Sequence, residues 1–296
     1  MPLEVRPVSE TPHLEAATPL EGDRIQIRVV PGDPTVGFGA FLDGVQRSQV
    51  LAHRGTVPLV HGAVAAAVRI RADRRMRTWR VPVVAQGVYA PVPLLDADFV
   101  ARLAAGCLVV DTLEGSGADA ELPHHPSGLA ARALTAVQRA REGAERSLAE
   151  AWIKESDSPL LIDGGIAGSA LVAQHPLAVG AVKSHRTLYV SGDSLAPTLA
   201  LRAGERTTAV ALASPRRTTV ATWYLRLRES GTRGPFFGLV RVEIAASGTA
   251  DLRDRADLVS RWLLAERTPV SLPDQRWDVL LHGIRDCEQY LSSILR

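Results

Sequence analysis

The sequence predicts a mixed α/β protein, and three observations lead to that prediction. Many short apolar runs are bounded by turn residues, as β-strands are. One long stretch, residues 129–153, repeats its apolar positions at helical spacing without a proline. Two further amphipathic stretches, 251–266 and 275–295, show the same spacing and close the chain. Strands, a long helix, more strands and terminal helices together predict a mixed sheet with flanking helices.

The first third of the chain predicts mostly strands. Residues 1–35 are rich in Pro, Glu and Thr with one β-like piece, so they predict an N-terminal β-rich arm, and the main domain spans 36–296. Asp96 is a candidate cap for a short helix over 96–106, and 107–115 predicts another strand. The runs that form an expected antiparallel meander are 36–43, 47–55, 57–70 and 79–87.

The second half continues as alternating strands and helices. After the long helix, "PLLID" (159–163) predicts a strand that ends on an acid. The following apolar runs predict strands at or within 175–190, 205–212, 216–229 and 236–244.

Composition bounds the class of protein. The chain has 296 residues, 46% hydrophobic and 22% charged, with a net charge of +2, which is ordinary for a folded globular protein. Cys107 and Cys287 show no disulfide or zinc spacing, which favours a reducing cytoplasm. We expect a cytoplasmic protein, because no signal peptide opens the chain and no apolar run reaches the roughly 18 residues of a membrane span.

Acidic residues end two of the predicted strands. Asp43 closes "GFGAFLD" and Asp163 closes "SPLLID", and a glycine follows each of them. Asp-Gly is also a common turn dipeptide, so either aspartate, taken alone, is more simply explained as a structural turn residue. Their paired context, with a long helix between them, predicts a ribonuclease H-like layout. That fold brings carboxylates from neighbouring strand ends and a crossing helix to divalent metal ions. The helix offers Glu142, Glu145 and Glu150.

Such a carboxylate set is suited to phosphodiester hydrolysis. The reaction needs charge neutralisation at the phosphate and an activated water. Two divalent ions about 4 Å apart, held by Asp and Glu oxygens, supply both. The sequence therefore predicts a metal-dependent nuclease.

Five motifs in order resemble the NurA nuclease family. The family pattern runs from a strand ending in Asp-Gly, through a helix bearing an acid, to a second strand ending in Asp-Gly. A Gly-Val-Lys stretch and an Arg-x-Glu strand follow. This chain matches with "FLDG" (41–44), "REGAERSLAEAW" (141–152), "LLIDGG" (160–165), "GAVK" (180–183) and "RVEI" (241–244).

The resemblance implies specific roles. Asp43 and Asp163 would be metal ligands, with Glu145 as the helix ligand, while Glu142 and Glu150 stay open as alternatives. The metal would be Mn²⁺ or Mg²⁺. The alternative interpretation of any single glutamate on a long helix is a solvent-exposed side chain without a catalytic role.

Three further residues would support the site. Lys183, one of only two lysines in the chain, would meet the scissile phosphate or the departing strand. Arg241 and Glu243 would support the ligands, although Glu243 could equally face solvent from its strand.

Two positions depart from the family pattern. Val45 stands where the family usually has serine after the first Asp-Gly. The closing helix reads "LLHGIRDCEQY" instead of a Tyr-Pro pair followed by histidine, so His282 and Glu288 are the candidate substitutes. His282 also has a reading as a packed or capping side chain.

The resemblance also implies partners. The chain would form a homodimer and act on DNA ends with a HerA-type hexameric ATPase, in DNA end processing, repair or defence. The departures at Val45 and in the closing helix favour an alternative, a catalytically inactive scaffold that docks on the ATPase and guides DNA. A third reading is another ribonuclease H-like module of recombination or defence.

An arginine-rich stretch, "RIRADRRMRTWR" (69–80), is a candidate DNA-binding surface. Arginines contact phosphates and tryptophan can stack on a base. The candidate residues are Arg74, Arg75, Arg77 and Trp79. The alternative is a solvated face in an arginine-rich chain.

Overall fold

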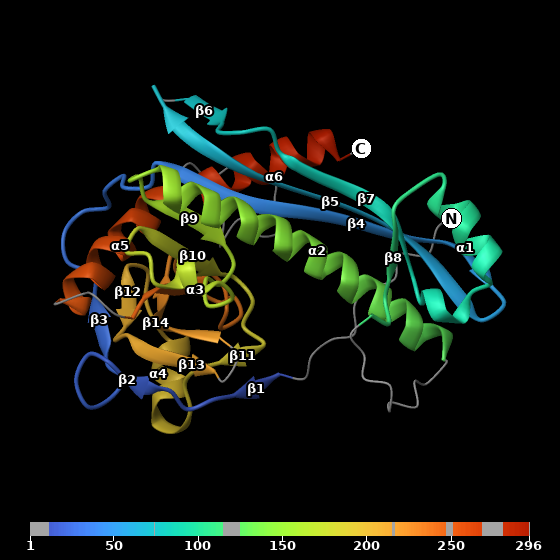
Figure 1. The fold of residues 1–296 in the computed structure, drawn as a ribbon. Helices are drawn as coiled ribbons and strands as arrows, with labels where there is room; N and C mark the ends of the chain where they lie inside the picture. Colours follow the sequence, from blue (N-terminus) through green and yellow to red (C-terminus); the bar gives the residue numbers. More distant parts are fainter. Residues whose placement is uncertain are drawn as a thin grey trace.

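The computed structural model describes residues 12–73, 75–114, 125–214, 217–246, 251–267 and 281–295. Over these residues the chain is a mixed α/β protein with a large mixed sheet and flanking helices, which confirms the predicted class (Figure 1). The main sheet has 13 strands within the described residues, and most of them follow the order β2-β13-β14-β15-β10-β9-β4-β5-β7-β8.

The centre of the sheet is a long hairpin with parallel strands added on one side. The hairpin joins β4 (Ala40–Arg54) to β5 (Val57–Ala72), and β7 (Val83–Ala90) continues it in antiparallel fashion. On the other side of β4, β9 (Leu160–Asp163) and β10 (Ala178–Val182) run parallel to it.

Antiparallel strands extend the sheet beyond β10. Next to it lies β15 (Leu239–Ala245), followed by β14 (Arg217–Arg226) and β13 (Val210–Ser214). The short remaining strands of this sheet are β2 (Thr18–Pro19), β3 (Ile27–Val29), β6 (Arg75–Thr78), β8 (Val109–Asp111) and β12 (Glu205–Thr207). A separate pair joins β1 (His13–Leu14) to β11 (Thr187–Leu188).

Helices cover both faces of the central strands (Figure 1). Alternate residues of β5 divide between them: Ala66 and Val68 share a core cluster with Trp152 of α2 (Pro126–Glu155), whereas Ala65 packs with Leu291 of α6 (His282–Ile294). This division follows from the two-residue repeat of a strand.

Shorter helices complete the fold. The helix α5 (Leu252–Glu266) packs its buried side chains against the half of the sheet formed by β14 and β15. The others are α1 (Ala97–Ala104), α3 (Ala170–Ala173) and α4 (Leu195–Leu199), with 3₁₀ turns at Val92–Leu94 and Gly192–Ser194. The predicted Asp96 cap is confirmed, because its carboxylate accepts a hydrogen bond from the amide of Phe99.

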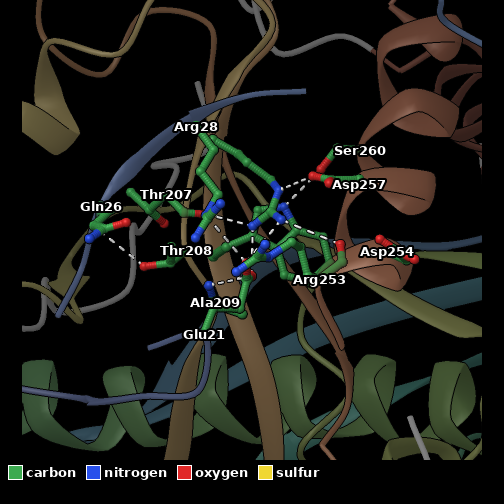
Figure 2. Close-up of polar contacts among 12 residues, drawn as sticks. Glu21, Gln26, Arg28, Thr207, Thr208, Ala209, Arg253, Asp254, Asp257 and Ser260 are labelled. Carbon is green, nitrogen blue, oxygen red and sulfur yellow. Dashed lines mark hydrogen bonds and ion pairs between the residues drawn. The ribbon is translucent and has the colours of Figure 1, made fainter. Parts of the chain in front are cut away.

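The segment predicted as an N-terminal arm is joined to the main sheet. Its strand β2 pairs with β13, and β3 pairs with β12. Between them, the buried carboxylate of Glu21 accepts hydrogen bonds from Arg206 and from the amide of Ala209 (Figure 2). Arg206 also donates to Asp257 on α5, so one buried ionic network ties this segment to the domain.

The clearest difference from the sequence prediction concerns the first Asp-Gly. We expected a strand to end at Asp43 and another to begin at 47, but β4 passes through both stretches without a break. Asp43 pairs with Ala67 and Gly44 with Ala66 on β5. The Asp-Gly dipeptide is therefore not a turn here, because its backbone is held in the ladder.

No helix in the described part of the chain is both long enough and apolar enough to span a membrane. Both cysteines are free, Cys107 exposed and Cys287 buried.

Candidate functional site

Asp43 and Asp163 lie side by side on neighbouring parallel strands. Leu42 on β4 is in register with Ile162 on β9, so each aspartate is the next residue along its strand. The strand β9 ends at Asp163, whereas β4 continues. Asp43 is buried, and its Oδ1 accepts a hydrogen bond of 2.7 Å from the amide of Gly44.

Glu145 reaches this point from α2. A Cβ atom placed on Gly44 would lie only 2.2 Å from Glu145 Oε1, so the glutamate occupies the space that any other residue at 44 would need. Gly44 has an ordinary extended backbone within β4. The glycine of this Asp-Gly therefore serves the approach of the helix carboxylate, not a turn.

Burial and neighbouring carboxylates raise the pKa of Asp43. Burial, and then the negative charge of Asp163, raise the pKa of Asp43 from 3.8 to about 8. Lys183 and the Gly44 amide act in the opposite direction, and the charge of Glu145 adds to the rise. Strong perturbation by burial and specific charges is typical of functional sites.

Glu145 shares this environment. Burial is the main cause that raises its pKa from 4.5 to about 7, and the charges of Asp163 and Glu142 act in the same direction. The guanidinium of Arg141, four residues earlier on α2, lowers it through an ion pair and a short hydrogen bond.

The other two helix glutamates have different contacts. Glu142 is exposed and accepts a hydrogen bond of 2.8 Å from Gln138. Glu150 accepts a hydrogen bond of 2.6 Å from the hydroxyl of Ser169, next to α3. Of the three candidates, Glu145 is therefore the one that the fold brings to Asp43 and Asp163.

Basic side chains form ion pairs with two of the three carboxylates. Lys183 Nζ lies 2.8 Å from Asp163 Oδ1, and Arg141 pairs with Glu145. Among the described residues, no group of three or more His, Cys, Asp or Glu side chains is arranged to hold a metal ion. The oxygen donors suit Mg²⁺ or Mn²⁺, but Asp163 and Glu145 would have to exchange their basic partners for the ion.

Glu243 braces the loop that follows Asp163. It is buried, so the alternative that it faces solvent is wrong. Its Oε2 accepts a hydrogen bond of 2.7 Å from the amide of Ile166, and its Oε1 accepts one of 2.5 Å from Arg241. Arg241 also donates to Thr222 on β14. The predicted supporting pair thus holds the backbone just beyond Asp163.

The closing helix presents a different residue to Asp43 than the sequence suggested. His282 is the exposed first residue of α6, and Glu288 is only partly buried. Cys287 on the same helix is buried, and burial first and then the charge of Asp43 raise the pKa of its thiol. Its Sγ donates to the carbonyl of Phe41. Only the helical spacing of Ile284, Cys287 and Leu291 marked this face in the sequence.

The arginine-rich stretch is largely engaged in intramolecular contacts. Trp79 packs edge-on against Trp152, with ring centroids 5.1 Å apart, and Arg80 covers its face. Arg77 lies 3.8 Å from Asp73, and Arg75 is exposed. Arg74 lies outside the described residues. Trp79 is therefore partly buried against a core cluster, and its contacts lend no support to base stacking.

A pocket of about 490 Å³ opens between α2 and the loop after β9. Its walls include Glu142 and Glu145 from the helix and Asp163 from the strand end. The sequence analysis assigned no role to its basic residues, because the 141–152 motif was interpreted by its acids alone. The basic residues of the pocket are Arg139, Arg141, Arg146 and Arg217.

No known protein family matches the chain, and a search of curated proteins found no match either.

Proposed function

We propose that this chain is a metal-dependent deoxyribonuclease with a ribonuclease H-like domain similar to that of the NurA nucleases. The observation that carries the proposal is the meeting of Asp43, Asp163 and Glu145, two strand acids in register and one helix acid over Gly44. The strand order also supports it. The strand β9 lies parallel to β4, and α2, which lies between these strands in the sequence, packs on β4.

Mn²⁺ or Mg²⁺ would neutralise charge at the phosphate and activate water. Asp43, Asp163 and Glu145 would hold the metal, because their oxygens are the ligands that these ions prefer. Their mutual repulsion supports this assignment, since a cation would remove the main like-charge cost of keeping them together. Lys183, released from Asp163, would then face the negative charge of the substrate.

The partner proposals rest on the motif resemblance alone. They are a homodimer and a HerA-type hexameric ATPase that delivers DNA ends.

Glu243 would keep the loop beyond Asp163 in place during the reaction.

The second candidate is an inactive scaffold that guides DNA on the same ATPase. The basic partners that occupy Asp163 and Glu145 favour it. Val45 favours it too, because this side chain packs in an apolar cluster with Leu291 of α6 and with Leu295 just after the helix, where the family usually has a hydroxyl.

Cleavage of linear DNA in Mn²⁺ and in chelator distinguishes the two candidates. We expect cutting only with the metal, and a loss of at least about 1000-fold in Asp43→Asn and Asp163→Asn, because each removes a metal ligand. Glu142→Gln is the matched control on the exposed face of α2 and should cut normally. Wild-type protein that binds DNA but does not cut it in Mn²⁺ or Mg²⁺, alone or with the ATPase, would establish the scaffold instead.

A further inference from the structure

Three arginines at the pocket have no anionic partner within the described residues. Arg139 and Arg146 project from α2, and Arg217 is the first residue of β14. All three are exposed and line the same pocket. We call them the rim arginines.

Several arginines elsewhere in the described residues are paired with acids. Arg71 pairs with Glu266, Arg206 with Glu21 and Asp257, and Arg241 with Glu243. Arg141, the fourth arginine of the pocket, pairs with Glu145. The rim arginines therefore leave uncompensated positive charge beside an acidic site, which suits an anionic ligand that the acids alone would repel.

The acids of the pocket do not cancel this charge. Asp163 is paired with Lys183, and Glu142 and Glu145 both lie within reach of Arg141. Arg139 and Arg146 are seven residues apart, so they lie on about the same side of α2, roughly 10.5 Å apart along its axis. Arg217 stands on a separate element. A ligand that meets all three must be extended and carry several negative charges.

We propose that the rim arginines bind successive phosphates of a single nucleic-acid strand and hold it across the pocket next to Asp163 and Glu145. The choice of ligand rests on the proposed function. The pocket volume, about 490 Å³, falls in the range of small-ligand sites and suits part of one strand more than a duplex. This surface differs from the 69–80 stretch, whose arginines are largely engaged elsewhere.

Binding of a fluorescein-labelled oligothymidylate of about 20 nucleotides, longer than a typical single-strand site, tests the proposal. Affinity is measured against salt concentration in chelator, so that no cleavage occurs. The triple variant Arg139→Ala/Arg146→Ala/Arg217→Ala should bind roughly tenfold more weakly at moderate salt. Its slope of log affinity against log salt should be shallower by about 2, because each single-strand phosphate contact contributes about 0.7.

Two matched variants control for general loss of charge. Arg24→Ala/Arg102→Ala/Arg202→Ala removes three exposed arginines outside the pocket, and Arg75→Ala/Arg77→Ala tests the other candidate surface. Both should keep the wild-type salt slope, with any change well below the value of about 0.7 that one lost contact gives. Circular-dichroism melts establish that each variant is folded, and Arg217→Ala alone, with an expected slope change of about 0.7, replaces the triple variant if that fails to fold.

Equal losses in the rim variant and the scattered control would overturn the proposal, as would a loss confined to Arg75→Ala/Arg77→Ala. The readout is independent of cutting. A protein that binds through the rim arginines but never cleaves in Mn²⁺ contradicts the proposed nuclease and leaves this strand-binding site standing. Normal cleavage by the variant without the rim arginines contradicts the strand-binding site and leaves the proposed nuclease standing.

Discussion

Two carboxylates in different clusters of the molecule are buried to nearly the same degree but have opposite surroundings. Glu21 is 6% exposed and Asp43 is 5% exposed. Glu21 accepts two hydrogen bonds from Arg206 and one from the amide of Ala209, and Arg28 lies 3.6 Å away (Figure 2). Asp43 accepts one hydrogen bond, from the Gly44 amide. The negative charges of Asp163 and Glu145 both act on it.

The difference shows what each cluster is for. A buried carboxylate with several charged donors is compensated, and it fixes how segments dock. A buried carboxylate crowded by other acids is uncompensated, and such an arrangement is unfavourable unless a cation joins it. Breaking the Glu21 cluster should therefore cost stability, whereas neutralising Asp43 should cost function.

The largest stability effect is expected at Arg206. Arg206→Met leaves Glu21 and Asp257 without their main cation, and breaking a buried pair from one side costs about 3–5 kcal/mol. Urea unfolding measures the loss in the free energy of unfolding. Arg202→Met, an exposed arginine four residues earlier, is the control and should change it by less than about 0.5 kcal/mol. A loss below about 1 kcal/mol in Arg206→Met would mean that the network is not a main anchor of the N-terminal segment.

Metal addition should stabilise the protein through the other cluster. If Asp43, Asp163 and Glu145 bind Mn²⁺, a concentration 100 times the Kd adds about 2.7 kcal/mol to the free energy of unfolding. Thermal melts with and without Mn²⁺ measure the gain. Asp163→Asn should lose the gain, whereas Arg206→Met should keep it despite its lower starting stability. An equal gain in wild type and Asp163→Asn would place the metal elsewhere.

The pH dependence of metal-free stability should also separate the clusters. Asp43 has a folded pKa of about 8 against 3.8 unfolded, so between these values the folded protein holds a proton that the unfolded chain has released. The contribution of Asp43 to stability is then highest at low pH, falls by up to about 1.4 kcal/mol per pH unit between these two values, and is lost above about pH 8. Glu145, raised from 4.5 to about 7, contributes with the same sign.

Asp43→Asn isolates this contribution. It removes the titrating group but keeps the size of the side chain, so its stability should fall less steeply than that of wild type between pH 5 and pH 8. Urea unfolding in chelator at several pH values measures both slopes. Parallel slopes would show that Asp43 is already ionised in the folded protein.

Local sequence patterns predicted much of the fold. The long helix was expected over 129–153 and spans Pro126–Glu155, because periodicity marks a helix interior better than its ends. The strands that carry Asp163 and Glu243 were also found. The continuity of β4 was missed, because its pairing partner β5 decides it and the local Asp-Gly signal points the other way.

Parts of the candidate site depended on contacts between distant segments. Motif order brought out Asp43, Glu145 and Asp163, but nothing local showed that Gly44 makes room for Glu145. The partners of Arg206 lie 185 and 51 residues away, so no spacing rule could link them. Arg217 joins Arg139 and Arg146 only around a pocket, which exists only after folding.

The smallest effects are expected at the two glutamates of α2 that have ordinary polar contacts. Glu142 is exposed, so Glu142→Gln should change stability by less than about 0.5 kcal/mol and leave cleavage unchanged. Glu150→Gln keeps a hydrogen-bond acceptor for Ser169 and should cost at most about 1 kcal/mol.

Glu145→Gln instead removes a charge that lies close to other acids. It should not lower metal-free stability below that of Glu150→Gln, but it should lower Mn²⁺-dependent cleavage the most. Unfolding and cleavage measured side by side give this ranking directly. If Glu142→Gln or Glu150→Gln damaged cleavage more than Glu145→Gln, the helix ligand would be another glutamate, and the contrast between compensated and crowded acids would not explain the site.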